Sequence, residues 1–223
     1  MKKKPIKNLG AVEEIITTEA DDGVSFDPAS ISFESIAQQA AYEGIRLKIT
    51  AHLDTARQNL QLDIGFGDVV VPHPILLEYP VLLESEKIEI SAYSWDSVVA
   101  EKFEACVKLS DLNSRMKDFH DIHFLLNNHD FAGKDLCNSI VATFRNRRTD
   151  LANAAYIFSE TFYSHPDKQR QWSAFLRAFH QQTSMQFSEV LLEIKTFLSS
   201  IIESILAETD FNGKWKAQEG RWI

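Results

Sequence analysis

The chain has 223 residues, of which 44% are hydrophobic and 25% are charged, a composition typical of a globular protein with one large or two small domains. The formal net charge of −9 excludes a general attraction to nucleic acid or to an anionic membrane, so a polyanion would have to bind at a local basic patch. The sequence has no apolar run of roughly 18 residues or more, which excludes a membrane-spanning helix.

The cysteines and the first residues predict a cytoplasmic protein. Cys106 and Cys137 are the only cysteines, and they form neither a Cys-x-x-Cys pair nor a disulfide framework, a pattern typical of reduced thiols. Lys2, Lys3 and Lys4 resemble the basic start of a signal peptide. They are followed by Lys7, Glu13 and Glu14 instead of an apolar segment, so we expect no secretion signal.

The first 95 residues predict mainly strands. A short helix is expected over Ile6–Thr18, then turns at Asp21–Gly23 and Asp27–Pro28, and a second helical segment over Ser32–Ala41.

Two strands follow, because apolar and polar residues alternate over Ile45–Leu53 and Leu60–Asp68. The short linker between them favours an antiparallel pair, which Pro72 and Pro74 bring to an end. One or two further short strands are expected at Val81–Leu83 and Ile88–Tyr93.

The second part of the chain predicts helices. Ser94 is placed to cap the helix that begins at Trp95, with Asp96 in its first turn. Further helices are expected over Ser114–Leu126, Lys134–Arg145, Leu151–Ser164, Lys168–Gln182 and Phe187–Glu208. The aromatic tail from Phe211 to Ile223 is expected to lie over this body. The order of elements predicts an α+β fold, with a strand-rich domain over residues 1–95 and a helical bundle over residues 96–223.

The stretch from Ala100 to Leu126 carries the residues most suited to chemistry. Lys102 lies in an apolar segment, while Asp118 and Asp121 are three positions apart and therefore share a helix face. A lysine that faces two carboxylates is either a structural ion cluster or part of a site that handles phosphate, and the pattern leaves both open. In the second interpretation Asp118 holds the lysine, and Asp121 supports the same network or orients a nucleophile.

Asp63 lies in the middle of the second predicted strand, on the face opposite its apolar residues. By itself the pattern favours a solvated carboxylate. The functional alternative is a ligand of Mg²⁺, which prefers carboxylate oxygens on a rigid element. Gly65 and Gly67 would leave room for a nucleotide beside it.

A concentrated set of basic residues gives this acidic chain its one candidate surface for RNA phosphates or a nucleotide: Arg115, Lys117, Arg145, Arg147 and Arg148. Solvated helix ends explain the same residues equally well.

His120 and His123 share a helix face, which raises the weaker hypothesis of a metal hydrolase. We interpret them as ordinary helix residues because further ligands at metal-site spacing are missing. The Gly-x-Ser-x-Gly, Walker and Gly-x-Gly-x-x-Gly patterns are also missing, which argues against triad hydrolases, P-loop enzymes and Rossmann enzymes.

Five segments in this order resemble the AbiEii/AbiGii toxin family of nucleotidyltransferases. They are Tyr42–Leu47 (YEGIRL), Leu62–Asp68 (LDIGFGD), Ala92–Tyr93, Ala100–Ala105 (AEKFEA) and Asn113–Asp121 (NSRMKDFHD). Thr143–Arg147 (TFRNR) and the tail Phe211–Trp215 (FNGKW) with Trp222 extend the resemblance, which covers about Asp21 to Ile223.

The resemblance implies a polymerase-β-like nucleotidyltransferase core followed by a helical bundle. It implies the toxin half of a bacterial toxin–antitoxin or phage abortive-infection pair with a separate antitoxin. The implied chemistry is Mg²⁺-dependent transfer of a nucleotide from a nucleoside triphosphate, in some members onto tRNA. Asp63 then matches the third metal-binding carboxylate, Lys102 the motif lysine, and Asp118 and Asp121 the two aspartates of the last motif.

The sequence departs from the family where the family has a Gly-Ser or Gly-Gly element and a strand with Asp-x-Asp. These residues are expected before Met1, because Asp21 and Asp22 are adjacent, lie in a turn and have no Gly-Ser before them. One aspartate cannot hold two Mg²⁺ ions, so we expect little or no transferase activity from this polypeptide alone. The alternative is a non-catalytic remnant that binds an antitoxin or RNA.

Overall fold

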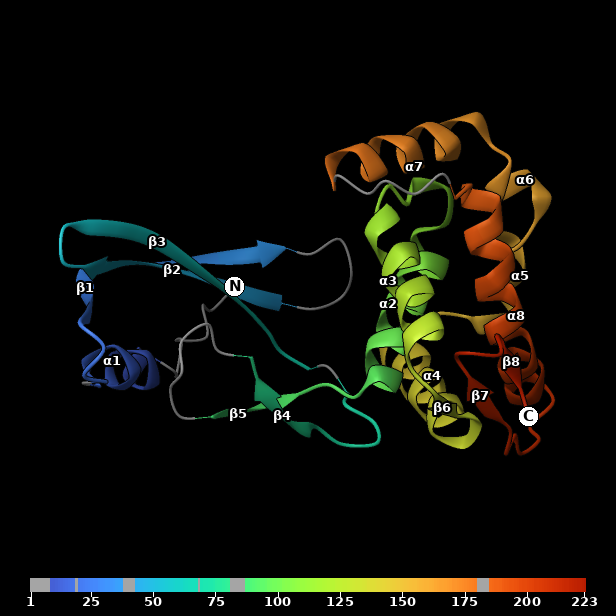
Figure 1. Cartoon of the computed structure of the whole chain (residues 1–223), viewed down its shortest axis with the longest axis horizontal. Helices are drawn as coiled ribbons and strands as arrows, with labels where there is room; N and C mark the ends of the chain where they lie inside the picture. Colours follow the sequence, from blue (N-terminus) through green and yellow to red (C-terminus); the bar gives the residue numbers. More distant parts are fainter. Residues whose placement is uncertain (1–8, 19, 38–42, 68, 81–86, 180–184) are drawn as a thin grey trace, which may run out of the picture. The chain divides into compact units, whose positions relative to one another are not determined.

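The computed structural model describes residues 9–18, 20–37, 43–67, 69–80, 87–179 and 185–223. The chain divides into two compact units, Met1–Asp68 and Val69–Ile223 (Figure 1), and each is described by itself. The architecture is α+β as predicted, with antiparallel sheets in the first part and helices in the second. The division into domains at residue 95 stays a prediction.

The first unit is a three-stranded antiparallel sheet with one helix. Its strands β1 (Val24–Ala37), β2 (Glu43–Leu53) and β3 (Ala56–Gly65) are ordered β1-β2-β3, and α1 (Leu9–Thr17) precedes them. The β2–β3 register pairs Ile45 with Ile64, Leu47 with Leu62 and Ile49 with Leu60, so one face of the sheet is apolar. The two strands and their antiparallel pairing are therefore confirmed, and α1 confirms the first helix over its described residues.

Strand β1 corrects the expected turn at Asp27–Pro28 and the expected helical segment over Ser32–Ala41, of which the structure describes residues up to Ala37. The chain is extended through both, and a break in the register between Asp27 and Ser32 accommodates the proline, which has no N–H to donate to a ladder. Beyond this break Phe33 pairs with Leu47 of β2. Pairing along β2 outweighs the local preference that suggested a helix.

The second unit begins with a hairpin of two strands, β4 (Ile75–Tyr79) and β5 (Ile88–Ala92). Strand β5 confirms the expected strand at Ile88–Tyr93, β4 was not predicted, and Val81–Leu83 lies outside the described residues. One face of the hairpin is apolar, because Leu77 pairs with Ile90 and Tyr79 with Ile88.

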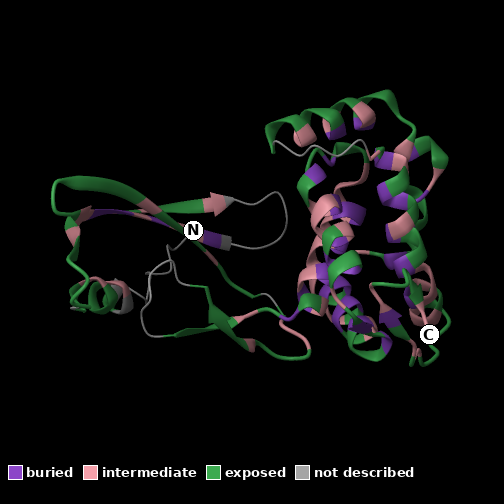
Figure 2. Cartoon of the chain, in the orientation of Figure 1, coloured by how far each residue is buried: buried purple, intermediate pink, exposed green. Residues whose placement is uncertain are grey.

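Helices α2 (Trp95–Leu109), α3 (Met116–Asn128), α4 (Gly133–Arg147) and α8 (Phe187–Leu206) form the body of this unit. The Ser94 hydroxyl accepts a hydrogen bond from Ser97 N and caps α2, as predicted. Figure 2 shows the buried residues gathered on the facing sides of the helices. Large side chains that are almost completely buried fill the space between them, among them Phe103, Phe119, Phe162, Phe187 and Phe197.

The expected long helix over Leu151–Ser164 is wrong. The chain instead forms a short 3-10 turn, η2 (Leu151–Asn153), then α5 (Ala154–Ile157) and α6 (Glu160–Tyr163). Asp150 and Ser159 each accept a hydrogen bond from a backbone N–H two or three residues later, which starts new helical turns. Helix α7 (Pro166–Ala178) follows and matches the next prediction over its described part.

The aromatic tail packs on the helices as expected and adds a small sheet. Strands β7 (Lys214–Lys216) and β8 (Arg221–Trp222) form a hairpin that pairs with β6 (Phe131–Ala132). The indole N–H of Trp215 donates to Leu126 O (2.6 Å) and that of Trp222 to Phe197 O (2.9 Å). Gly133 lets this sheet approach α4, because a Cβ there would lie 2.4 Å from the Phe211 ring. Across the described residues, no helix combines the length and apolarity needed to cross a membrane.

Candidate functional site

The structure brings together four of the predicted site residues. Lys102 of α2 points its ammonium at α3, where Nζ lies 3.2 Å from Asp118 Oδ1 and 2.6 Å from Asp121 Oδ2. Lys117 Nζ also lies 2.6 Å from Asp121 Oδ2. We call these four residues the lysine–aspartate cluster. Lys102, Asp118 and Asp121 are each about one fifth exposed, so the cluster is sheltered but open to solvent.

The cluster exists because α2 and α3 run beside each other around a tight turn. The turn contains the 3-10 segment η1 (Ser110–Leu112) and Asn113, which is fully buried. Asn113 Oδ1 accepts a hydrogen bond from Arg115 N (2.8 Å), immediately before α3 begins. The side chain of Asn113 thereby sets the start of the helix that carries both aspartates.

A buried lysine from α7 fixes the same turn. Lys168 is only 4% exposed, and its ammonium donates to Asp111 O (2.9 Å) and Asn113 O (2.7 Å). It also lies over the Phe162 ring, 5.0 Å from its centroid. Burial lowers the pKa of Lys168, against the opposing charges of Asp111 and Asp167. No sequence pattern singled out this residue, since a lone lysine in a helix is usually exposed.

The charges in the cluster stabilise one another. Burial disfavours the Lys102 ammonium, but the hydrogen bond with Asp121 and the charges of both aspartates outweigh it, so the pKa of Lys102 is raised. Burial likewise opposes the Asp121 carboxylate, and the hydrogen bonds from Lys102 and Lys117 prevail, so its pKa is lowered. The Lys102 ammonium and the Asp121 carboxylate therefore each stabilise the charged form of the other.

Asp63 lies in the first unit, on β3, and both of its carboxylate oxygens are engaged. Arg46 of β2 donates from Nε to Oδ1 and from Nη2 to Oδ2, each at 2.8 Å. This bidentate pair lowers the pKa of Asp63. Because strands β2 and β3 pair Arg46 directly with Asp63, the register itself creates the contact.

The described residues do not form a fitting site for two Mg²⁺ ions. They contain no cluster of three or more His, Cys, Asp or Glu side chains that could hold a metal. The single carboxylate that the sequence suggested, Asp63, is held by a guanidinium.

Arg147 pairs with two glutamates of α2 instead of pointing into solvent, where an RNA could reach it. Its guanidinium lies 3.1 Å from Glu104 Oε2 and 3.4 Å from Glu101 Oε2, and its side chain is 16% exposed. Glu104 is almost fully buried, and the Thr149 hydroxyl also donates to it. A buried carboxylate needs such partners, so Arg147 compensates a charge inside the bundle.

The other predicted basic residues are exposed. Arg115 and Lys117 lie at the beginning of α3, and Arg145 lies in the last turn of α4. Arg148 ends α4 in a left-handed conformation (φ 53°) and lines a hollow of about 500 Å³ together with Lys108 and Ser110. Arg148 and Lys108 thus lie at one opening.

The two histidines point to different neighbours. His123 Nε2 lies 2.8 Å from Glu193 Oε2 of α8, whereas the His120 ring packs 5.4 Å from that of Phe175 of α7. This arrangement agrees with their interpretation as ordinary helix residues.

A family model described as "Nucleotidyl transferase AbiEii toxin, Type IV TA system" matches residues 6–193. The chain belongs to this family. A solved structure that is similar to the AbiEii-family chain is JHP933 from Helicobacter pylori, with 15% identity and a TM-score of 0.45 over 92% of this chain and 74% of that chain. No curated protein matches.

Membership of the AbiEii family confirms the resemblance that the motifs carried. It makes the chain a relative of nucleotidyl transferase toxins of type IV toxin–antitoxin systems. The match includes the residues of the lysine–aspartate cluster, Asp63, and its partner Arg46, which the sequence analysis did not single out. The alternation around Arg46 could have revealed that partner, since it lies on the same polar strand face as Asp63 once the register is known.

Proposed function

We propose that this chain is the toxin partner of a toxin–antitoxin pair and that the lysine–aspartate cluster contacts the phosphates of a nucleoside triphosphate. The observation that carries the proposal is the position of Lys102. Two of its three N–H groups are directed to Asp118 and Asp121, which leaves the third for a ligand. An ammonium held in this way offers a fixed positive charge to phosphate oxygens.

In nucleotidyl transfer an acceptor oxygen forms a bond to the α-phosphorus while the bond to the leaving pyrophosphate breaks. Negative charge on the phosphate oxygens has to be stabilised as this occurs. Lys102 would supply part of that stabilisation, and Asp118 and Asp121 would keep its ammonium charged and oriented. Mg²⁺ is the metal that the family resemblance implies, and Asp63 is proposed as its ligand.

The polypeptide alone is proposed to have little transferase activity, because its sequence contains no Asp-x-Asp segment. Two-metal phosphoryl transfer needs carboxylates on both ions. The proposed partners are a nucleoside triphosphate, an antitoxin protein and an RNA acceptor such as tRNA. Arg115, Lys117, Arg145 and Arg148 are the proposed RNA contacts, and Arg147 leaves this group because it pairs with Glu104.

The test combines activity and binding. Purified protein is incubated with labelled nucleoside triphosphates, Mg²⁺ and tRNA, and we expect no clear incorporation; clear incorporation contradicts the proposed inactivity.

Equilibrium binding of inorganic tripolyphosphate and ATP is then compared between the natural chain and Lys102→Met. Weaker binding of both ligands supports the phosphate site, and unchanged binding of both contradicts it. Lys195→Met, a lysine of α8 outside the cluster, is the matched control.

A second candidate function is binding without catalysis. It is favoured by the exposed arginines and by the bidentate engagement of Asp63. Binding of tRNA that is weakened by Arg145→Ala and Arg148→Ala, in a protein that binds no triphosphate, would favour this function over the first.

A further inference from the structure

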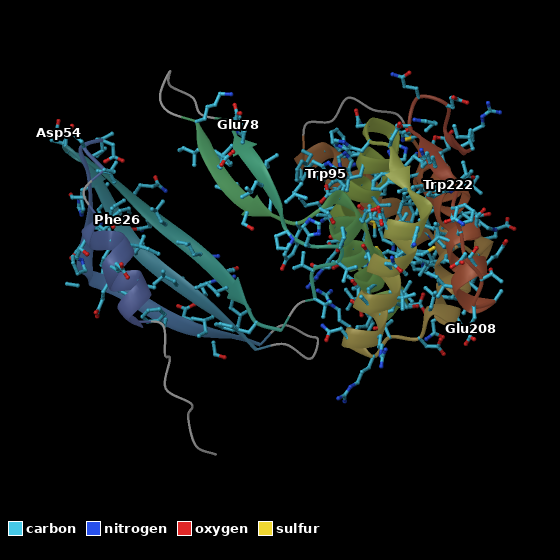
Figure 3. The ribbon with its side chains drawn as sticks, turned by 90° about the horizontal axis from the view of Figure 1, so that it is seen from below. Phe26, Asp54, Glu78, Trp95, Glu208 and Trp222 are labelled. Carbon is cyan, nitrogen blue, oxygen red and sulfur yellow. The ribbon has the colours of Figure 1, made fainter. Side chains whose placement is uncertain are left out.

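Trp95 differs from the other three tryptophans of the chain. The indole N–H groups of Trp172, Trp215 and Trp222 each donate to a main-chain carbonyl, at 2.6 to 2.9 Å. Within the described part of the chain, Trp95 Nε1 has no such acceptor, and the residue is 39% exposed (Figure 3). A tryptophan with an exposed side chain gains less from packing than a buried one.

The Trp95 ring is nevertheless fixed in orientation. It stacks on the His129 ring with a centroid distance of 4.6 Å and an interplanar angle of 26°. Trp95 is the first residue of α2, and His129 is the residue that ends α3. The rings come from the beginning of α2 and the end of α3, so they form a stacked aromatic pair at one end of the α2–α3 seam, which we call the platform.

This platform is aligned with the lysine–aspartate cluster. Trp95 and Lys102 are seven residues apart, which is nearly two full helical turns, so both project from the same face of α2. The rise between them is about 10.5 Å along the helix axis. An extended nucleoside triphosphate separates its base from its terminal phosphate by a comparable length.

We propose that the Trp95–His129 platform binds the nucleobase of the nucleoside triphosphate whose phosphates contact Lys102. This inference rests on the proposed phosphate site and assigns the other end of the same ligand. Every base has a π-face, so stacking on the platform provides affinity with little preference among bases. The half-buried Val98, between Trp95 and Lys102 on α2, leaves an apolar surface for the sugar edge.

The experiment compares ATP with inorganic tripolyphosphate, which lacks a base. In Trp95→Ala we expect ATP to bind roughly 5- to 150-fold more weakly, the loss typical of removing one base–aromatic stack, and tripolyphosphate to bind as before. Trp95→Phe retains a ring and should recover most of the ATP affinity. ATP should also quench the fluorescence of the natural chain, and this quenching should be lost in Trp95→Phe, because Trp172 and Trp215 are buried.

Two further variants make the outcome decisive. Phe124→Ala removes an exposed aromatic residue of α3 that is outside the platform and should leave ATP binding unchanged. A loss with Phe124→Ala but not with Trp95→Ala overturns the platform, as does an equal loss of ATP and tripolyphosphate in a folded Trp95→Ala protein. If Lys102→Met weakens the binding of both ligands while Trp95→Ala weakens neither, the proposed platform is wrong and the phosphate site is supported. If Lys102→Met weakens neither ligand, or neither ligand binds, the proposed phosphate site fails and the platform with it. Thermal unfolding of each variant confirms that it is folded.

Discussion

Lys102 Nζ lies 2.6 Å from Asp121 Oδ2, and this ion pair links α2 to the helix that carries both motif aspartates. Removing it leaves two sheltered carboxylates close to each other. We therefore expect Lys102→Met to lower the free energy of unfolding by about 1–3 kcal/mol at neutral pH, less than for fully buried pairs because the cluster is partly exposed. Urea unfolding measures the change.

The pH dependence of that loss follows from Asp121. Its pKa in the folded state is lowered, so its contribution to stability is present above its unfolded pKa and is lost as the pH falls through the folded value. The difference between the natural chain and Lys102→Met should therefore shrink on acidification. Lys117→Met, at a side chain that is 57% exposed, is the control and should cost less than about 0.5 kcal/mol. A difference that grows toward acid would contradict this account of the cluster.

Arg147 and Arg145 should behave differently although both lie at the end of α4. Arg147→Ala leaves the Glu104 carboxylate buried without its main cation, which typically costs about 3–5 kcal/mol. Arg145→Ala, at an exposed position, should change stability by less than about 0.5 kcal/mol. Thermal unfolding of the two variants checks this, and similar values for both would refute a structural role for Arg147.

Asp96 gives the second unit a pH-sensitive stability. Burial raises its pKa to about 6, against the backbone hydrogen bond that lowers it, and the nearby Asp135 adds to the rise. Because the pKa of Asp96 is raised in the folded state, its contribution to stability is fully present below the unfolded pKa, near 3.8, and is lost as the pH rises through about 6. We expect Asp96→Asn to be more stable at pH 8 by about 1–2 kcal/mol, after discounting for solvent screening, and nearly equal at pH 3.5. Chemical unfolding at both pH values tests this, and no gain at pH 8 would rule it out.

Arg46→Ala tests the predicted role of Asp63. Without its guanidinium partner, the pKa of Asp63 should rise toward the ordinary value of an aspartate. NMR titration of the carboxyl group measures that change. If Asp63 is a metal ligand, Mg²⁺ should shift its resonance more in Arg46→Ala than in the natural chain. Arg57→Ala, which changes an arginine on β3, the strand of Asp63, serves as the control. Equal shifts in all three proteins would leave the carboxylate with its ion-pair role only.

Periodicity located most elements because their burial is one-sided. The alternation over Ile45–Leu53 and the apolar stripe of α8 each follow from a single face that packs on a core. The helix predicted over Ser32–Ala41 is wrong for the described residues up to Ala37, because Phe33 and Ile36 are three apart and fit a helix as well as a strand. The conformation of this segment depends on pairing with the next strand, β2, and the pattern within the segment does not show that pairing.

The same limit explains what could be predicted of the site. Asp118 and Asp121 share a helix face by spacing alone, so their meeting with Lys102 across a short turn could be anticipated. The ion pair between Arg46 and Asp63 depends on strand register. The ion pair between Arg147 and Glu104 depends on the packing of α2 against α4. Lys168 reaches the turn before α3 from 55 residues away, a contact that no short motif encodes.

The Phe211 ring occupies the space in which any side chain at position 133 would begin. A substitution of Gly133 would therefore displace the ring, and with it Trp222, whose ring lies 5.0 Å from that of Phe211. Replacing Phe211 by a smaller residue opens that space. Natural variation at these two sites should consequently be correlated, with larger residues at 133 tolerated only in chains that have already reduced the side chain at 211.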